Sequence, residues 1–154
     1  MSARFEIPGA TAIELEHVIL DVNGTLTQRG DLIPGVAERI APLRQRVVVH
    51  LLSADTRGQL DAVAERLAVP AQAISRGDEK RSFVERLGAD RCGAIGNGLN
   101  DAPMLQAVRL GTAIVGPEGA SSAALAAAEV VCATITAALD LLLDPVTLAS
   151  TLRP

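Results

Sequence analysis

Residues 17–27, HVILDVNGTLT, contain the stretch that decides the fold. The first six, His17–Val22, form an apolar, β-branched run with the length of a buried strand. The carboxylate of Asp21 stands at the end of this run, and the turn-forming pair Asn23-Gly24 follows it. Small and hydroxyl-bearing residues continue to Thr27. We therefore expect a buried strand that ends in a polar loop.

Further apolar runs alternate with amphipathic stretches along the chain. The runs predict strands at Arg46–Ala54, Ala73–Ser75 (weakly), Cys92–Gly96, Gly111–Val115 and Glu129–Ala133. The stretches between them predict helices at Val36–Gln45, Thr56–Leu67, Glu79–Leu87, Ala102–Val108, Ala120–Ala127 and Ile135–Leu143. Strands separated by single helices favour right-handed βαβ units and a parallel sheet. The sequence thus predicts an α/β fold, a three-layer Rossmann-like sandwich in which residues 1–154 form one domain.

Several of these helices carry recognisable starting signals. The signals are capping residues, a proline suited to a first turn, and hydroxyls, namely Asp55-Thr56, Asp78, Pro103 and Ser121-Ser122. They support the helix assignments independently of the apolar pattern.

The composition argues against several classes of partner. The net charge is −4 and the only aromatic residues besides histidine are two Phe, so a basic, stacking surface for nucleic acid is not expected. The most apolar region, residues 120–143, is interrupted by Glu129 and Asp140, which argues against a membrane span. Residues 1–8 show no apolar signal core. We expect a cytoplasmic protein whose two isolated cysteines, Cys92 and Cys132, are small buried side chains.

Polar residues occupy the places where a parallel sheet would bind a ligand. They are the DVNGTLT loop after the first strand, Ser53 after the second, Lys80 at the start of a helix, and GNGLNDAPML (96–105) after Cys92–Gly96. The carboxyl ends of parallel strands share one edge, which brings these groups together. A carboxylate can attack phosphorus, a hydroxyl and an ammonium can hold the transferred group, and a second carboxylate can share Mg²⁺. The set therefore predicts a phosphoryl-transfer site.

These four ordered features resemble the motifs of the haloacid dehalogenase (HAD) superfamily. DVNGTLT resembles its first motif, while Ser53 and Lys80 fit its hydroxyl and lysine motifs. GNGLNDAPML closely resembles the hinge motif of P-type ATPase phosphorylation domains. The likeness covers nearly the whole chain and points to a soluble, P-type ATPase-like subgroup. It implies a HAD-type fold without a cap domain, because residues 23–34 leave room only for a short flap and residues 53–80 only for one helix and one strand.

The resemblance also implies roles for individual residues. Asp21 would be the nucleophile that forms an aspartyl-phosphate. The ligands of Mg²⁺ would be oxygen atoms of four residues, namely Asp21, Asn23 (through its backbone carbonyl), Asn97 and Asp101. Phosphate would be contacted by Gly24, Thr25, Ser53, Lys80 and Asn100. Lys80 would also steady Asp21. The expected partner is a phosphorylated small molecule or a phosphoprotein.

Two positions depart from the usual phosphatase pattern. Asn23 stands where such phosphatases carry a general acid/base Asp, and an amide cannot exchange the required proton. Because acid–base help is typically worth about 10²–10⁴-fold, we expect slow turnover of alkyl phosphates and a smaller loss for acyl or aryl phosphates. Asn97 stands where many relatives have Asp, which predicts weaker Mg²⁺ binding.

The sequence also allows other interpretations. The chain could be a weak or inactive phosphate-binding, regulatory module, or it could serve only in assembly. An open, uncapped site and the Ala-rich region 120–143 also make a homo-oligomer an expectation. A dinucleotide-binding reading of Gly96-x-Gly98 is disfavoured because Asp101 stands at the third glycine position. His17 and His50 are expected to pack in or beside the core.

Overall fold

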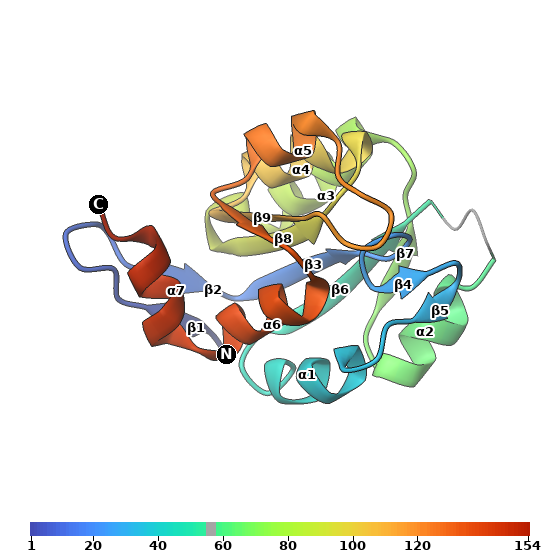
Figure 1. Cartoon of the computed structure of the whole chain (residues 1–154), viewed down its shortest axis with the longest axis horizontal. Helices are drawn as coiled ribbons and strands as arrows, with labels where there is room; N and C mark the ends of the chain where they lie inside the picture. Colours follow the sequence, from blue (N-terminus) through green and yellow to red (C-terminus); the bar gives the residue numbers. More distant parts are fainter. Residues whose placement is uncertain (55–57) are drawn as a thin grey trace.

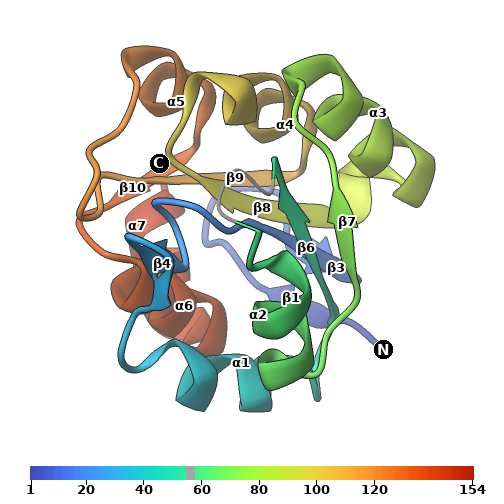
Figure 2. The same ribbon diagram turned by 90° about the vertical axis from the view of Figure 1, so that its right-hand side faces the viewer.

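A computed structural model describes residues 1–54 and 58–154. Its centre is a six-stranded parallel sheet with the order β10-β9-β8-β3-β6-β7. The strands are β3 His17–Asp21, β6 Val48–Ser53, β7 Ala71–Ala73, β8 Cys92–Gly96, β9 Leu110–Ile114 and β10 Val130–Cys132. Helices cover both faces of this sheet (Figures 1 and 2), so the predicted three-layer α/β fold is confirmed.

The helices form one layer on each face of the sheet (Figure 1). One layer contains α1 Val36–Leu43, α2 Leu60–Leu67 and α6 Ile135–Leu143, and the other contains α3 Gly77–Leu87, α4 Ala102–Ala107 and α5 Ser122–Ala127. Neighbouring residues of β3 serve different cores: Leu20 packs with the first layer and Ile19 with the second. Because side chains alternate along a strand, a sheet covered on both faces requires the continuous apolar run seen at residues 18–20.

Most predicted elements agree with the structure to within a few residues, and β8 and α6 have the predicted bounds. The strand predicted at Ala73–Ser75 is instead Ala71–Ala73. All three of its residues are exposed at the sheet edge, so no apolar alternation marks its position. Its register is set by tertiary pairing, with Ala71 opposite Leu51 of β6.

The predicted helix starts have mixed outcomes. Ser121 caps α5, since its Oγ accepts the N–H of Ala124 at 3.1 Å, and Pro103 lies in the first turn of α4. The prediction for Asp78 is wrong: Arg76 is the N-cap residue of α3, and Asp78 lies in the first turn, paired with Arg76 at 2.9 Å. Helix α2 begins at Leu60 rather than Thr56, and the expected cap Asp55-Thr56 lies outside the described residues.

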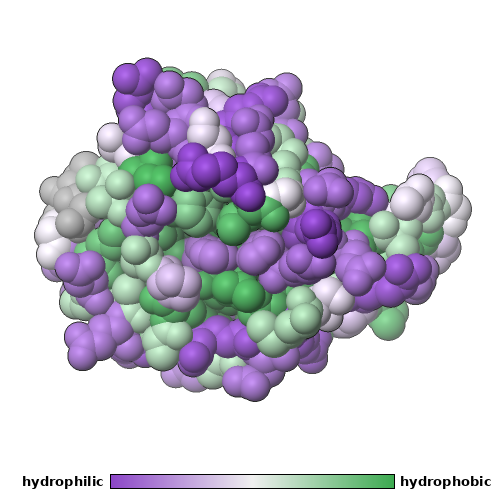
Figure 3. Space-filling model, turned by 180° about the vertical axis from the view of Figure 1, so that it is seen from behind, coloured by the Kyte–Doolittle hydropathy of each residue, from purple (hydrophilic) through white to green (hydrophobic). Residues whose placement is uncertain are grey.

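Two peripheral features were not predicted. An antiparallel hairpin of β1 Ala3–Phe5 and β2 Ile13–Leu15 packs near α7 Pro145–Leu152. The connection between β1 and β2 projects from the body of the molecule (Figures 1 and 3). A signal for α7 was present, because Asp144 accepts the N–H groups of Val146 and Thr147, both at 3.2 Å, and a proline follows it.

Two apolar helices, α6 and α7, follow one another near the end of the chain. Among the described residues, no single helix has the length and apolar composition needed to cross one. Helices α6 and α7 reach that length and composition only when taken together, across a bend of 104°.

The connection between β3 and α1 contains the expected short flap. It is a hairpin of β4 Thr27–Gln28 and β5 Asp31–Leu32. Residues 22–35 are all described, and they hold no larger insertion than this hairpin.

The sheet order creates a switch point between β3 and β8. From β3 the chain moves outward through β6 and β7, and it then returns through α3 to pair β8 with the other side of β3. Ligands of such sheets bind beyond the carboxyl ends of the strands at the place where the order reverses. Asp21 ends β3 and Gly96 ends β8, so both predicted motif loops flank this point.

His17 and His50 pack against each other, a pairing that the sequence did not reveal. His17 Nδ1 and His50 Nε2 lie 3.1 Å apart, and the His50 ring also meets the edge of Phe83. Burial, together with the charge of His17, lowers the pKa of His50 from 6.5 to about 4. The folded protein therefore holds His50 neutral at pH values where the unfolded chain binds a proton.

The free energy of unfolding is expected to fall as the pH is lowered from about 6.5 towards 4, because only the unfolded state takes up the proton. Since the ring is partly exposed, we expect His50 to account for about 1–2 kcal/mol of this fall. Urea unfolding of wild type and His50→Gln at pH 7 and pH 5 measures it. The variant should lose less stability than wild type between the two pH values, and an equal loss would contradict the assignment.

Candidate functional site

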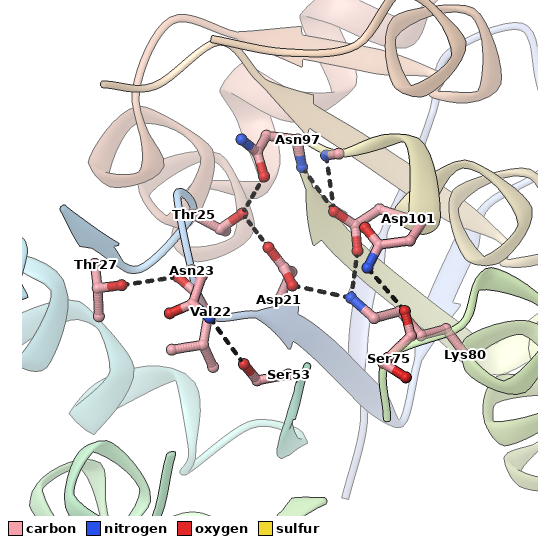
Figure 4. A network of polar contacts seen from close by, with 12 residues as sticks. Asp21, Val22, Asn23, Thr25, Thr27, Ser53, Ser75, Lys80, Asn97 and Asp101 are labelled. Carbon is pink, nitrogen blue, oxygen red and sulfur yellow. Dashed lines mark hydrogen bonds and ion pairs between the residues drawn. The ribbon is translucent and has the colours of Figure 1, made fainter. Parts of the chain in front are cut away.

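A buried ion-pair cluster forms the floor of the switch point. The Lys80 ammonium, whose side chain is fully buried, donates to Asp21 Oδ1 at 2.9 Å and to Asp101 Oδ1 at 2.7 Å (Figure 4). Asp21 comes from the end of β3, Lys80 from the first part of α3, and Asp101 from the turn before α4. One cation thus joins the two carboxylates that the sequence placed in separate motifs.

Burial and charge shift the proton affinities in this cluster. Burial, reinforced by the negative charge of Asp101, raises the pKa of Asp21 to about 6, although Lys80 and Thr25 act in the opposite direction. Burial alone would lower the pKa of Lys80, but the charges and hydrogen bonds of the two carboxylates outweigh it and hold that pKa above its usual value. Lys80 therefore stays charged, whereas Asp21 is a carboxylate of unusually high basicity.

Asp101 is held from the other side by backbone groups. Its Oδ2 accepts the N–H of Asn97 at 3.1 Å and the N–H of Gly98 at 2.9 Å. Together with the bond from Lys80, both of its oxygens are engaged, and the side chain has no solvent exposure. This arrangement favours a role in fixing Lys80 and the 97–98 backbone, and direct Mg²⁺ binding by Asp101 stays a prediction.

The Thr25 hydroxyl links the loops after β3 and β8. It lies 2.9 Å from Asp21 Oδ2 and 3.3 Å from Asn97 Oδ1 (Figure 4). The second distance is longer than usual for a hydroxyl hydrogen bond, so the Asn97 oxygen is only weakly engaged by it. The Asn97 amide nitrogen turns away and donates to the carbonyl of Gly119 at 2.9 Å.

The loop after Asp21 is closed by its own backbone. The N–H groups of Thr25, Leu26 and Thr27 all donate to the carbonyl of Val22, and the N–H of Gly24 donates to Thr27. Gly24 has φ +74°, a conformation that favours glycine. Since the amides of Gly24 and Thr25 bond within the loop, direct phosphate contact by these two residues stays a prediction.

The other predicted site residues lie around this loop. Asn23 approaches the buried Ser53 of β6, with Nδ2 and Oγ 3.5 Å apart, so both lie on the β6 side of Asp21. Asn100 donates from Nδ2 to the carbonyl of Ser75 at 3.0 Å, which ties the 96–101 loop to the segment before α3. The predicted residues that Figure 4 labels lie together at one edge of the sheet, namely Asp21, Asn23, Thr25, Ser53, Lys80, Asn97 and Asp101. Gly24 lies against Asn97, and Asn100 bonds the segment before α3.

Two oxygen atoms of the kind that a hard divalent cation prefers lie next to the Thr25 hydroxyl. Asp21 Oδ2 and Asn97 Oδ1 flank the Thr25 hydroxyl, and Asn23 follows Asp21 by two residues. In residues 1–54 and 58–154 no group of three or more His, Cys, Asp or Glu side chains could hold a metal ion. The donor set fits a Mg²⁺-like ion that keeps several waters, but it contains few charged ligands.

The segment between β9 and α5 also borders the site, which the sequence did not indicate. Besides the Asn97–Gly119 contact, the N–H of Ser121 donates to the carbonyl of Asn97 at 2.8 Å. Gly116 lies against the backbone of Gly24, where an added methyl carbon would come 3.1 Å from the Gly24 carbonyl oxygen. No local sequence motif predicts these contacts, because they join loops that are distant in the sequence.

Comparison with known proteins gives one clear relative by sequence. A stretch of 39 residues is 44% identical to "Uncharacterized protein MJ0072" of Methanocaldococcus jannaschii, and it covers 89% of that protein and 25% of this chain. The chain belongs to the family of that archaeal protein. Its name states no function, and no family model matches the chain.

Solved structures identify the fold. The cobalt-bound deoxy-D-mannose-octulosonate 8-phosphate phosphatase of Haemophilus influenzae has a TM-score of 0.71 and 18% identity, over 88% of this chain and 91% of that one. The 3-deoxy-D-manno-octulosonate 8-phosphate phosphatase of Moraxella catarrhalis, in complex with magnesium, phosphate and KDO, has a TM-score of 0.69 and 15% identity, over 85% and 87%. A HAD family hydrolase of Streptomyces avermitilis has a TM-score of 0.69 and 23% identity, over 85% and 84%. The fold is that of HAD hydrolases.

Proposed function

We propose that this protein is a divalent-metal-dependent phosphohydrolase or phosphotransferase that works through an aspartyl-phosphate on Asp21. The observation that carries the proposal is the position of this carboxylate. It ends β3 at the switch point and is held on one oxygen by Lys80 and on the other by Thr25. A carboxylate fixed in this way, with its pKa raised to about 6, combines a defined orientation with high nucleophilicity.

The reaction would proceed in two displacements. An Asp21 oxygen bonds to phosphorus as the bond to the leaving oxygen breaks, and water later attacks phosphorus to release phosphate and restore the carboxylate. Lys80 holds Asp21 and carries positive charge beside the transferred group. When bound by Asp21, the Asn23 carbonyl and Asn97, a divalent cation would neutralise phosphate charge. The amide of Asn23 is not acidic enough to protonate a leaving group, so the leaving group must depart as an anion or take its proton from water.

The phosphatases among the structural neighbours support this reaction class. Their substrates are phosphate monoesters of a sugar acid by name, and the structures include bound magnesium, phosphate or cobalt. For this protein we propose a phosphorylated small molecule as the substrate class and Mg²⁺ as the cation, with a phosphoprotein as the alternative substrate. The sequence GNGLNDAPML resembles that of P-type ATPases, and those proteins also lack an Asp at the position of Asn23. Both similarities support a long-lived phosphoenzyme.

Covalent trapping tests the proposal. The protein is incubated with Mg²⁺ and, in separate samples, acetyl phosphate, ATP or p-nitrophenyl phosphate, then quenched in acid and analysed by intact mass and peptide mapping. We expect a gain of one phosphoryl group on Asp21, strongest with acetyl phosphate because its leaving group needs no proton.

Asp21→Asn is the matched control, since it keeps the size of the side chain and removes the nucleophile. The adduct should be absent in that variant. Absence of an adduct in wild type, together with no released phosphate, would overturn the proposal and favour a phosphate-binding module. Peptide mapping also checks that Asn23 and Asn97 remain amides, because both precede glycine and deamidation would create Asp at these positions.

A further inference from the structure

The loop between β9 and α5 brings an acidic side chain to the site that no motif includes. Two hydrogen bonds join this loop to Asn97. Asn97 Nδ2 donates to the Gly119 carbonyl at 2.9 Å, and the Ser121 N–H donates to the Asn97 carbonyl at 2.8 Å. Glu118 lies within the loop, one residue before Gly119. These hydrogen bonds place Glu118 beside the loop that follows Asp21.

The Glu118 carboxylate and the Asn97 amide face the same point. A methyl carbon added at Gly24 would lie 3.0 Å from Asn97 Nδ2, and 3.3 Å and 3.4 Å from the carboxyl carbon and Oε2 of Glu118. Three segments therefore converge there, with Gly24 from the first motif, Asn97 from the last, and Glu118 from a loop outside both. The Glu118 carboxylate therefore lies beside the Asn97 side chain, on the side of its amide nitrogen and next to the backbone of Gly24.

Glu118 is available for such a role. Its side chain is exposed, and within residues 1–54 and 58–154 no hydrogen bond or ion pair engages its carboxylate. The carboxylate of Asp101, by contrast, accepts hydrogen bonds from Lys80 and from two backbone N–H groups. The oxygens of Glu118, unlike those of Asp101, thus remain open to the waters around a bound ion.

The charge of the site indicates why a further carboxylate matters. Asp21 and Asp101 supply two negative charges, and Lys80 compensates one of them. Asn23 and Asn97 contribute dipoles only. The protein groups around a divalent cation therefore carry a net charge of only −1. Such a site binds the cation weakly unless another anion lies nearby.

We propose that Glu118 supplies this anion and strengthens cation binding at Asp21 and Asn97 by acting on the water shell that the ion retains. The inference rests on the proposed function for the existence of the cation site, and it adds a residue from outside the motifs. Glu118 would be a positioning residue for metal-bound water. It would compensate for the amide at position 97 from a different part of the chain.

The test measures metal binding without turnover. Mn²⁺, which gives an electron paramagnetic resonance signal when free in solution, is titrated into wild type and Glu118→Gln at pH 7, and Mg²⁺ is then used as a competitor. We expect Glu118→Gln to weaken Mn²⁺ binding by about 10–100-fold, the range typical for partners of metal-bound groups. Its thermal unfolding midpoint should stay unchanged, because the carboxylate makes no contact that stabilises the fold.

Glu65→Gln is the matched control. It removes the same charge from an exposed position in the last turn of α2, away from the motif loops. Equal Mn²⁺ affinity in Glu118→Gln, Glu65→Gln and wild type would overturn the inference while leaving the metal site itself intact. Wild type that binds no Mn²⁺ would overturn both the inference and the metal-dependent part of the proposed function. In that case, phosphoenzyme formation that needs no metal would show that Asp21 is still the nucleophile, although the metal-dependent part of the proposal is wrong.

Discussion

Replacing Lys80 by methionine is expected to lower the free energy of unfolding by about 3–5 kcal/mol. The side chain is fully buried, and its ammonium is the group that joins Asp21 and Asp101. Methionine fills nearly the same space but leaves two carboxylates facing each other without a cation. Because stabilities of single domains are typically about 5–15 kcal/mol, this loss is a large share of the total. Urea unfolding at pH 7 measures it.

Arg81→Met provides the comparison in the same helix. Arg81 is the next residue, is about half exposed, and pairs with Glu85 at 2.8 Å, so its loss should cost no more than about 0.5 kcal/mol. The deficit of Lys80→Met should also be larger at pH 8 than at pH 5, since proton uptake by one carboxyl relieves the repulsion. Equal stability of the two variants would show that Lys80 does not hold the site together.

Restoring the missing acid by Asn23→Asp is expected to raise hydrolysis of alkyl phosphates by about 10²–10⁴-fold. Asn23 lies two residues after Asp21 and approaches Ser53 of β6, so an acid there would border the same loop as the nucleophile. Acyl phosphates should gain much less, because their leaving groups need no proton. The measurement is steady-state phosphate release from a matched pair, one alkyl and one acyl phosphate.

Gln106→Glu controls for the added charge. This amide is exposed on α4 and becomes an acid without approaching the Asp21 loop, so it should leave turnover of both substrates unchanged. A faster decay of the trapped phosphoenzyme in Asn23→Asp would confirm that the position governs the proton transfer. A variant that forms the adduct but hydrolyses alkyl phosphates no faster would refute the acid–base explanation for slow turnover.

Predictions from local pattern were accurate where a short window carried the information. The buried strand before Asp21, the strand Cys92–Gly96 and the helix Ile135–Leu143 were found from apolar periodicity alone. The strand Ala71–Ala73 was misplaced because its exposed side chains carry no such signal. Asp78 was misassigned because α3 begins at Gly77, so the Asp78 carboxylate lies in the first turn, where it binds Arg76 and accepts the N–H of Glu79. Each error occurs where contacts with another element, or with a competing side chain, outweighed local preference.

The succession of the six strands of the central sheet, and the polar residues that follow β3, β6 and β8, could be predicted from the sequence, because strand and helix periodicity act over a few neighbouring positions. Which of those residues touch depends on the packing of segments that are distant in the sequence. Lys80 meets Asp21 across 59 positions, and Thr25 meets Asn97 across 72. These contacts arise because β3 pairs with both β6 and β8, and that choice depends on burying two helical layers at once. The position of Glu118 likewise depends on tertiary structure. It is set by the packing of the loop after β9, and no feature of its own segment indicates it.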